Sequence, residues 1–146
     1  MHVAQILSQK GTAVATVAPS DTIEVAVAVL AEHGFGALVV SSDGSSIDGI
    51  VSERDVVRGL ATDGPELLGA PISQVMTAAV LTCGTDDTVE QLMAQMTKHR
   101  IRHLPVEVDG AIAGMVSIGD VVKARVSELE DEARHIQGYI QSSGYS

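Results

Sequence analysis

Two stretches of the chain follow one pattern, GIVSERD at residues 49–55 and GMVSIGD at residues 114–120. Each contains a glycine, two apolar residues, a serine, two variable residues and an aspartate. A serine followed three residues later by an acid is a capping box, which predicts a helix that begins directly after a strand. The alternative is a ligand-binding motif that the chain uses twice.

Both stretches belong to a longer repeat. DTIE at residues 21–24 recurs as DTVE at 87–90, and the Asp-Gly pair at 43–44 recurs at 109–110. The shared features follow in the same order in both halves of the chain, which indicates a duplication. We therefore expect four parts, namely a first copy (1–62), a connector (63–71), a second copy (72–126) and a C-terminal helix with a frayed end (127–146).

Each copy predicts the same order of elements. An extended stretch comes first, TAVATV at 12–17 or AAVLTC at 78–83. A helix follows, with Asp21 or Asp87 as the expected N-cap, because each has a glutamate three residues later. A β-branched strand, a turn at the Asp-Gly pair and a return strand then lead to the serine that begins a second helix. The predicted fold class is α/β (α+β), with two β-α-β-β-α units. A single unit is so small that it leaves one sheet face uncovered, so we expect the two units to pack sheet to sheet in pseudo-twofold symmetry.

The composition argues against several partners. The net charge is −10, from 19 acidic and 9 basic residues, so DNA, RNA and anionic membranes are not expected partners. We expect neither a signal peptide nor a membrane span, because no apolar run is long enough to cross a bilayer. A single cysteine, Cys83, cannot form an internal disulfide, which fits a cytoplasmic location. We interpret it as a small buried apolar residue.

The sequence contains no catalytic or metal-binding constellation. Its five histidines lack the paired spacing of a zinc site, so we expect no metal beyond a magnesium ion that accompanies a nucleotide. It has no serine-histidine-aspartate order, no cysteine-histidine pair and no phosphate-cradling glycine loop. We therefore expect a protein that is not an enzyme.

The duplicated unit resembles a known family. Its layout, the segment IRHLPV at 101–106 and the two Gly-x-x-Ser-x-x-Asp endings are similar to those of a tandem pair of cystathionine-β-synthase (CBS) domains. The resemblance implies a regulatory module, also called a Bateman module, that binds an adenine nucleotide or a related adenosyl ligand in clefts between the repeats. It implies AMP before ADP or ATP, and these before NAD(H) or S-adenosylmethionine. It also implies a homodimer and a client protein that the module regulates.

With this resemblance, the repeated motif acquires a role in binding. Asp55 and Asp120 offer carboxylates that suit the two hydroxyls of a ribose, and Ser52 and Ser117 stand at helix starts, where phosphate binds. A serine that caps its helix can also contact a ligand, so the two interpretations are compatible. The glycine before each serine lets another group approach the backbone closely, which a cap does not require. Family position adds six candidate ligand-binding residues, namely Thr16, Gly36, Thr82, Arg102, His103 and Pro105. The two threonines are explained equally well as ordinary strand residues.

A basic segment, TKHRIRHLPV at 97–106, distinguishes the two copies. We expect Arg102 and His103 to meet phosphate, and the alternative is a solvated basic edge. If the segment is a strand, alternate side chains face opposite ways, so Arg100, Arg102 and His103 cannot all line one pocket. The first copy has Gly36 where the second has Arg102.

The two clefts are therefore expected to differ. We predict that the preferred, phosphate-binding cleft is centred on the second motif and lies beside the basic segment. The cleft at the first motif is predicted to be weaker, empty or suited to a less charged ligand. The helix after that motif offers Arg54 and Arg58 instead, and the alternative is that they are only surface charges.

The C-terminal segment carries its own pattern. Apolar residues recur at alternating steps of four and three from Val122 to Ile140, which predicts a helix with a heptad-like stripe. The stripe either docks on its own domain or meets a partner helix, for which the second subunit of a dimer is favoured. A second function therefore stays open, that of a ligand-free dimeric scaffold that acts through this helix.

Overall fold

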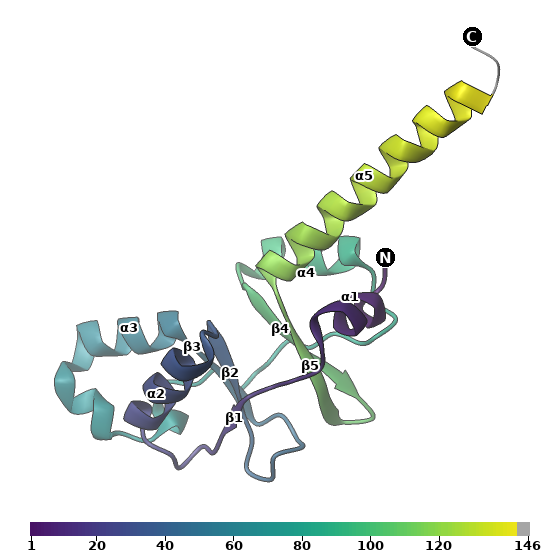
Figure 1. The fold of residues 1–146 in the computed structure, drawn as a ribbon. Helices are drawn as coiled ribbons and strands as arrows, with labels where there is room; N and C mark the ends of the chain where they lie inside the picture. The colour runs from purple at the N-terminus through teal and green to yellow at the C-terminus, as the bar shows by residue number, and fades with distance from the viewer. Residues whose placement is uncertain (143–146) are drawn as a thin grey trace.

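Two lobes repeat one order of elements, and a long helix extends from the second lobe (Figure 1). The structure is a computed structural model that describes residues 1–142, with side chains for 1–139. The elements are α1 (Val3–Lys10), β1 (Thr16–Val17), α2 (Ile23–His33), β2 (Ala37–Val40), β3 (Gly49–Ser52), α3 (Glu53–Asp63), η1 (Pro65–Gly69), η2 (Ile72–Gln74), α4 (Val89–His99), β4 (His103–Val108), β5 (Ala111–Ser117) and α5 (Ile118–Ser142).

Each lobe is built on a small sheet. In the first lobe β2 lies between a parallel β1 and an antiparallel β3. In the second lobe β4 pairs antiparallel with β5, and Cys83 forms a parallel bridge with Val106 at the place that β1 takes in the first lobe. These pairings confirm the predicted α/β class and the β-α-β-β-α order, with the first strand of the second lobe reduced to one bridge.

Threonines, and not the predicted aspartates, cap the first helix of each lobe. Thr22 accepts a hydrogen bond from the Val25 N–H, and Thr88 accepts one from the Gln91 N–H. Asp21 instead accepts a hydrogen bond from the Ala18 N–H at 2.9 Å. Its counterpart Asp87 accepts one from the Gly84 N–H at 2.8 Å. The expected caps were therefore wrong by one residue, because each aspartate closes the preceding turn and leaves the cap to the hydroxyl that follows it.

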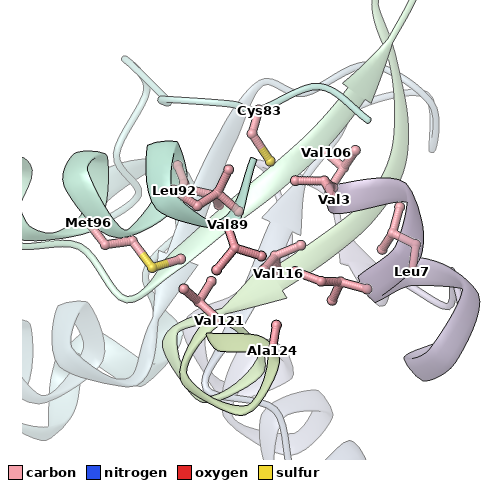
Figure 2. Close-up of a cluster of buried hydrophobic side chains, with 12 residues drawn as sticks. Val3, Leu7, Cys83, Val89, Leu92, Met96, Val106, Val116, Val121 and Ala124 are labelled. Atoms are coloured by element: carbon pink, nitrogen blue, oxygen red, sulfur yellow. The ribbon is translucent and has the colours of Figure 1, made fainter. Parts of the chain in front are cut away.

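Each lobe completes its core with a segment that the sequence attaches to the other copy. The N-terminal helix α1 packs on β5, and Val3 and Leu7 lie in the core of the second lobe beside Val106 and Val116 (Figure 2). The segment from η1 to Met76 packs in the same way on the first lobe. The division of the sequence at 62 and 72 stays a prediction, and in space the two lobes exchange these segments.

The second helix of the second copy continues without a break into the C-terminal segment. α5 spans 25 residues, and its free end projects far from both lobes (Figure 1). The predicted frayed end falls mostly on residues 143–146, which lie outside the described residues. Within the described part of the chain, no helix is both long enough and apolar enough to cross a membrane.

Candidate functional site

Both copies of the repeated motif form the same capping box. The Asp55 Oδ2 accepts from the Ser52 N–H at 2.8 Å and from its hydroxyl at 2.9 Å, and the Asp55 N–H donates back to the Ser52 Oγ at 3.3 Å. The corresponding distances for Ser117 and Asp120 are 2.8, 3.0 and 3.2 Å. The motif is therefore a helix cap in both lobes. In each aspartate, Oδ1 accepts no hydrogen bond from the described residues, so one carboxylate oxygen is left for a ligand.

The glycine of each motif makes room for the exchanged segment. A Cβ at Gly114 would lie 2.7 Å from Leu7 Cδ2, and a Cβ at Gly49 would lie 2.8 Å from Met76 Sδ. Both distances are well below ordinary contact. The close approach that we expected at these glycines is thus real, but the approaching group belongs to the chain itself.

The first cleft is a cavity of about 360 Å³ between the lobes. Its floor is the first motif, and its opposite wall is the segment between α4 and β4 of the second lobe. The cavity is also lined by Thr77, Ala79, Val80 and Leu81, which follow the exchanged segment that ends at Met76. The polar and charged residues that line the cavity are Ser52, Glu53, Arg54, Asp55, Arg58, Thr77, His99, Arg100, Arg102 and His103.

Positive charge is concentrated in this first cleft. Four of the nine Lys and Arg residues line it, against two carboxylates, although the chain as a whole has a net charge of −10. Within residues 1–139, none of these four arginines forms an ion pair with an acid. Unpaired guanidinium groups around one cavity form a site for an anion with several charged oxygens.

The basic segment is not a strand over its whole length, and this corrects a prediction. Arg100 ends α4 with a left-handed backbone (φ 54°), and β4 begins only at His103. Arg100, Ile101, Arg102 and His103 therefore escape the alternation of a strand, and all four line the first cleft.

The second cleft has a different character. It is a cavity of about 250 Å³ that Ser117 lines together with glycines, alanines, Phe35 and Met115, and no arginine lines it. Lys10 lies at its edge and places its Nζ 2.6 Å from the Asp120 Oδ2. The arginines of the basic segment thus line the cleft of the first motif and not that of Ser117, whereas His103 lines both clefts.

A family model for the CBS domain matches the chain twice, over residues 3–62 and 72–127. The chain belongs to the CBS-domain family. A CBS-domain containing protein of known structure from Agrobacterium tumefaciens is 45% identical, with a TM-score of 0.81 over 85% of this CBS pair and 92% of that chain. The mitochondrial CBS domain-containing protein CBSX3 of Arabidopsis thaliana is 39% identical over 86% of this chain, which spans 62% of the relative's length.

A further solved structure gives a ligand for a related CBS pair. It is the CBS domain pair of protein MJ0100 in complex with 5′-methylthioadenosine and S-adenosyl-L-methionine. That pair is 24% identical to this one, with a TM-score of 0.77 over 88% of this chain and 98% of its own. At this identity the likeness shows the shared fold alone.

His103 lies between the two clefts of the CBS pair and lines both. A Cβ at Gly36 would lie 2.9 Å from the His103 Nε2, so the missing side chain of Gly36 provides the space for the imidazole. Burial lowers the pKa of His103, although the charge of Glu53 acts in the opposite direction. The ring is therefore neutral at neutral pH and can accept or donate a single hydrogen bond on either nitrogen.

Besides Asp120, which pairs with Lys10, three further candidates do not line either cleft. Thr16 is exposed on β1, Thr82 is half-buried, and Pro105 is buried in β4, where its carbonyl accepts from the Cys83 N–H. Their roles in ligand binding stay predictions. Within the described residues, no group of three or more His, Cys, Asp or Glu side chains is arranged to hold a metal ion.

Sequence reasoning did not assign two kinds of cleft residue. The sequence left open whether Arg54 and Arg58 are cleft bases or surface charges, and both line the first cleft. Lys10 was not singled out at all. No local signal marks it, because its partner Asp120 lies 110 residues away in the sequence.

Proposed function

We propose that this CBS pair is a regulatory module that binds an adenine nucleotide in the first cleft. The observation that carries the proposal is the cluster of four unpaired arginines beside the free Oδ1 of Asp55. The CBS pair with bound 5′-methylthioadenosine and S-adenosyl-L-methionine supports an adenosyl ligand. Ligand that favours one arrangement of the lobes would shift its population and change the surface offered to a client protein.

Each part of a nucleotide has a matching group in this cleft. The carboxylate of Asp55 can accept from the cis-diol of a ribose. Ile50, Val80, Leu81 and Ile101 line the cavity with apolar surface that suits a planar base. The guanidinium groups remain for the phosphates, and four of them provide more donors than one phosphate needs. We therefore propose ADP or ATP above AMP, which reverses the order implied by the family resemblance.

Calorimetric titration of the full chain tests this assignment. We expect binding of ATP and ADP, weaker binding of AMP, and little binding of adenosine. Replacing Arg102 by Ala removes a charge-assisted hydrogen bond and should weaken ADP binding about tenfold or more. Arg134→Ala is the matched control, because Arg134 lies on α5 and pairs with Asp131 at 2.7 Å. Equal affinity for ADP and adenosine, or no binding at millimolar nucleotide, would contradict the proposal.

The exposed face of α5 favours a second function, association with another copy of this chain. Val122, Val126, Leu129 and Ile136 are about half exposed or more, at 52, 49, 48 and 61%. They lie roughly a third of a turn around the helix from Val121 and Ala124, the side chains of α5 that pack into the second lobe. The stripe therefore does not dock on its own lobe.

The charges beside the stripe suit a parallel pair of α5 helices. With Val126 at an a position and Leu129 at a d position, Arg125 falls at g and Glu130 at the following e. In a parallel pair, Arg125 of one helix lies near Glu130 of the other and attracts it. In an antiparallel pair centred on this heptad, the two copies of Glu130 face each other and repel. We propose a homodimer that forms through α5, and with it a scaffold that could present a client surface without ligand.

The mass in solution tests this second proposal. Light scattering after gel filtration is expected to give a dimer for the native chain and a monomer for Leu129→Glu. Arg134→Glu is a control on the same helix, outside the stripe and 69% exposed. A native chain that is monomeric at high concentration, or a Leu129→Glu chain that remains dimeric, would overturn it.

A further inference from the structure

Lys10 lines the second cleft and pairs with Asp120, the counterpart of Asp55, although Asp120 does not itself line this cleft. Its Nζ lies 2.6 Å from the Asp120 Oδ2 and 2.8 Å from the Met115 carbonyl oxygen. Both partners belong to the strand-to-helix junction of the second lobe, whereas Lys10 is the last residue of α1. The ammonium group is half-exposed and the carboxylate is 22% exposed, so the pair lies at the mouth of the cleft.

Three hydrogen bonds thus converge on one oxygen of Asp120. Ser117 supplies two of them, as Ser52 does for Asp55 in the first cleft, and Lys10 adds the third. Burial raises the pKa of Asp120, but the bonds from Lys10 and Ser117 outweigh it and hold the pKa below its usual value. The carboxylate is ionised and already has a cationic partner.

The first cleft has no such lysine, and the pseudo-symmetry of the fold identifies the residue that stands in its place. The two exchanged segments make equivalent contacts in the two lobes, with Leu7 against Gly114 and Met76 against Gly49. The backbone agrees, because the Met1 carbonyl accepts from the Val89 N–H just as the Ala70 carbonyl accepts from the Ile23 N–H.

Beyond Leu7 and Met76 the two segments diverge, because α1 continues to Lys10 whereas Thr77 pairs with Ile50 in a bridge, but the sequence position that matches Lys10 is Ala79. Ala79 lines the first cleft, and its methyl group can neither donate a hydrogen bond nor carry charge. Asp55 forms no ion pair with any described residue. The two lobes therefore contain equivalent aspartates, of which Asp55 has no cationic partner within residues 1–139 and Asp120 is paired with Lys10.

We propose that Lys10 is a built-in competitor that closes the second cleft to ribose, so that the chain binds one nucleotide and not two. This inference rests on the proposed nucleotide-binding function of the first cleft. Ribose hydroxyls at the Asp120 Oδ1 would meet a carboxylate whose charge Lys10 already compensates, so they gain less there than at the unpaired Asp55. Specificity between the clefts then depends on α1, a segment outside the second copy in sequence.

Two reciprocal substitutions test the inference. Lys10→Met keeps the apolar stem but removes the ammonium group, and Ala79→Lys introduces one into the cleft that Asp55 lines. Titration with ADP is expected to give one site for the native chain, and titration with adenosine, which needs no arginine, a site in Lys10→Met that the native chain lacks. Ala79→Lys should weaken the first site about tenfold, as expected for competition with one charge-assisted hydrogen bond.

The outcomes separate this inference from the function on which it rests. No ADP binding by the native chain would overturn the proposed function. No adenosine binding by Lys10→Met, or two equal ADP sites in the native chain, would overturn the role of Lys10 alone. Ala79→Lys leaves α1 intact, so it decides the question even if Lys10→Met fails to fold, and undiminished ADP binding by Ala79→Lys would overturn the inference.

Discussion

Replacing Gly114 by alanine should destabilise the fold in the absence of any ligand. The added Cβ would lie 2.7 Å from Leu7 Cδ2, whereas ordinary contacts lie at 3.4–4 Å, so the buried Leu7 side chain, or the helix α1 that carries it, must shift by roughly 1 Å. Overpacking of this kind costs about 1–3 kcal/mol. For a chain of this length each kcal/mol lowers the melting temperature by about 2–4 °C, which gives a loss of about 2–12 °C.

Urea unfolding of matched variants measures this loss. Gly119→Ala is the control, because its Cβ would lie 3.6 Å from the Ser117 Oγ, an ordinary contact, and alanine favours a helix. Leu7→Ala alone should cost about 2–5 kcal/mol through the cavity that it leaves. If overlap is the cause, the double variant with Gly114→Ala loses less than the sum of the two single losses. A stable Gly114→Ala, or strictly additive losses, would refute the reasoning.

Three more predictions concern the side chains of Cys83, His103 and Ser52. Burial, reinforced by the charge of Asp87, raises the pKa of the Cys83 thiol to about 12. A thiol reagent should therefore modify this cysteine only after the chain unfolds. Rapid modification of the native chain would contradict this prediction. Because burial lowers the pKa of His103 below 6.5, the unfolded chain takes up a proton that the folded chain does not. The free energy of unfolding should then fall as the pH drops below about 6.5. His103→Gln should make the free energy of unfolding depend less steeply on pH in this range. An unchanged dependence on pH would contradict this prediction. Ser52→Ala removes a helix cap and should cost about 1 kcal/mol in urea unfolding, whereas no loss would mean that the hydroxyl contributes nothing to the helix.

The parts of the fold that local patterns determine could be predicted from the sequence. The duplicated order of elements and the capping boxes at Ser52 and Ser117 follow from residue types a few positions apart, and both are present. The predicted N-cap of the first helix in each copy was wrong by one residue. Aspartate and threonine are both good N-caps, so the sequence alone does not choose between neighbours of these two types.

The charge of the clefts could not be predicted in the same way. It depends on which lobe faces which motif, and on the backbone turn at Arg100 that frees the basic segment from strand alternation. The contact between Lys10 and Asp120 likewise depends on a segment exchange that no short-range pattern records. The candidate residues were thus largely present in the sequence, but their grouping required the fold.

A crystal structure of the full chain grown with ADP tests the central claim most directly. We predict electron density in the first cleft, with the ribose hydroxyls at the Asp55 Oδ1, the phosphates within hydrogen-bond distance of Arg102, and the Lys10–Asp120 contact intact. Density for ADP at Ser117 and Asp120, with the arginine-lined cleft unoccupied, would contradict the account.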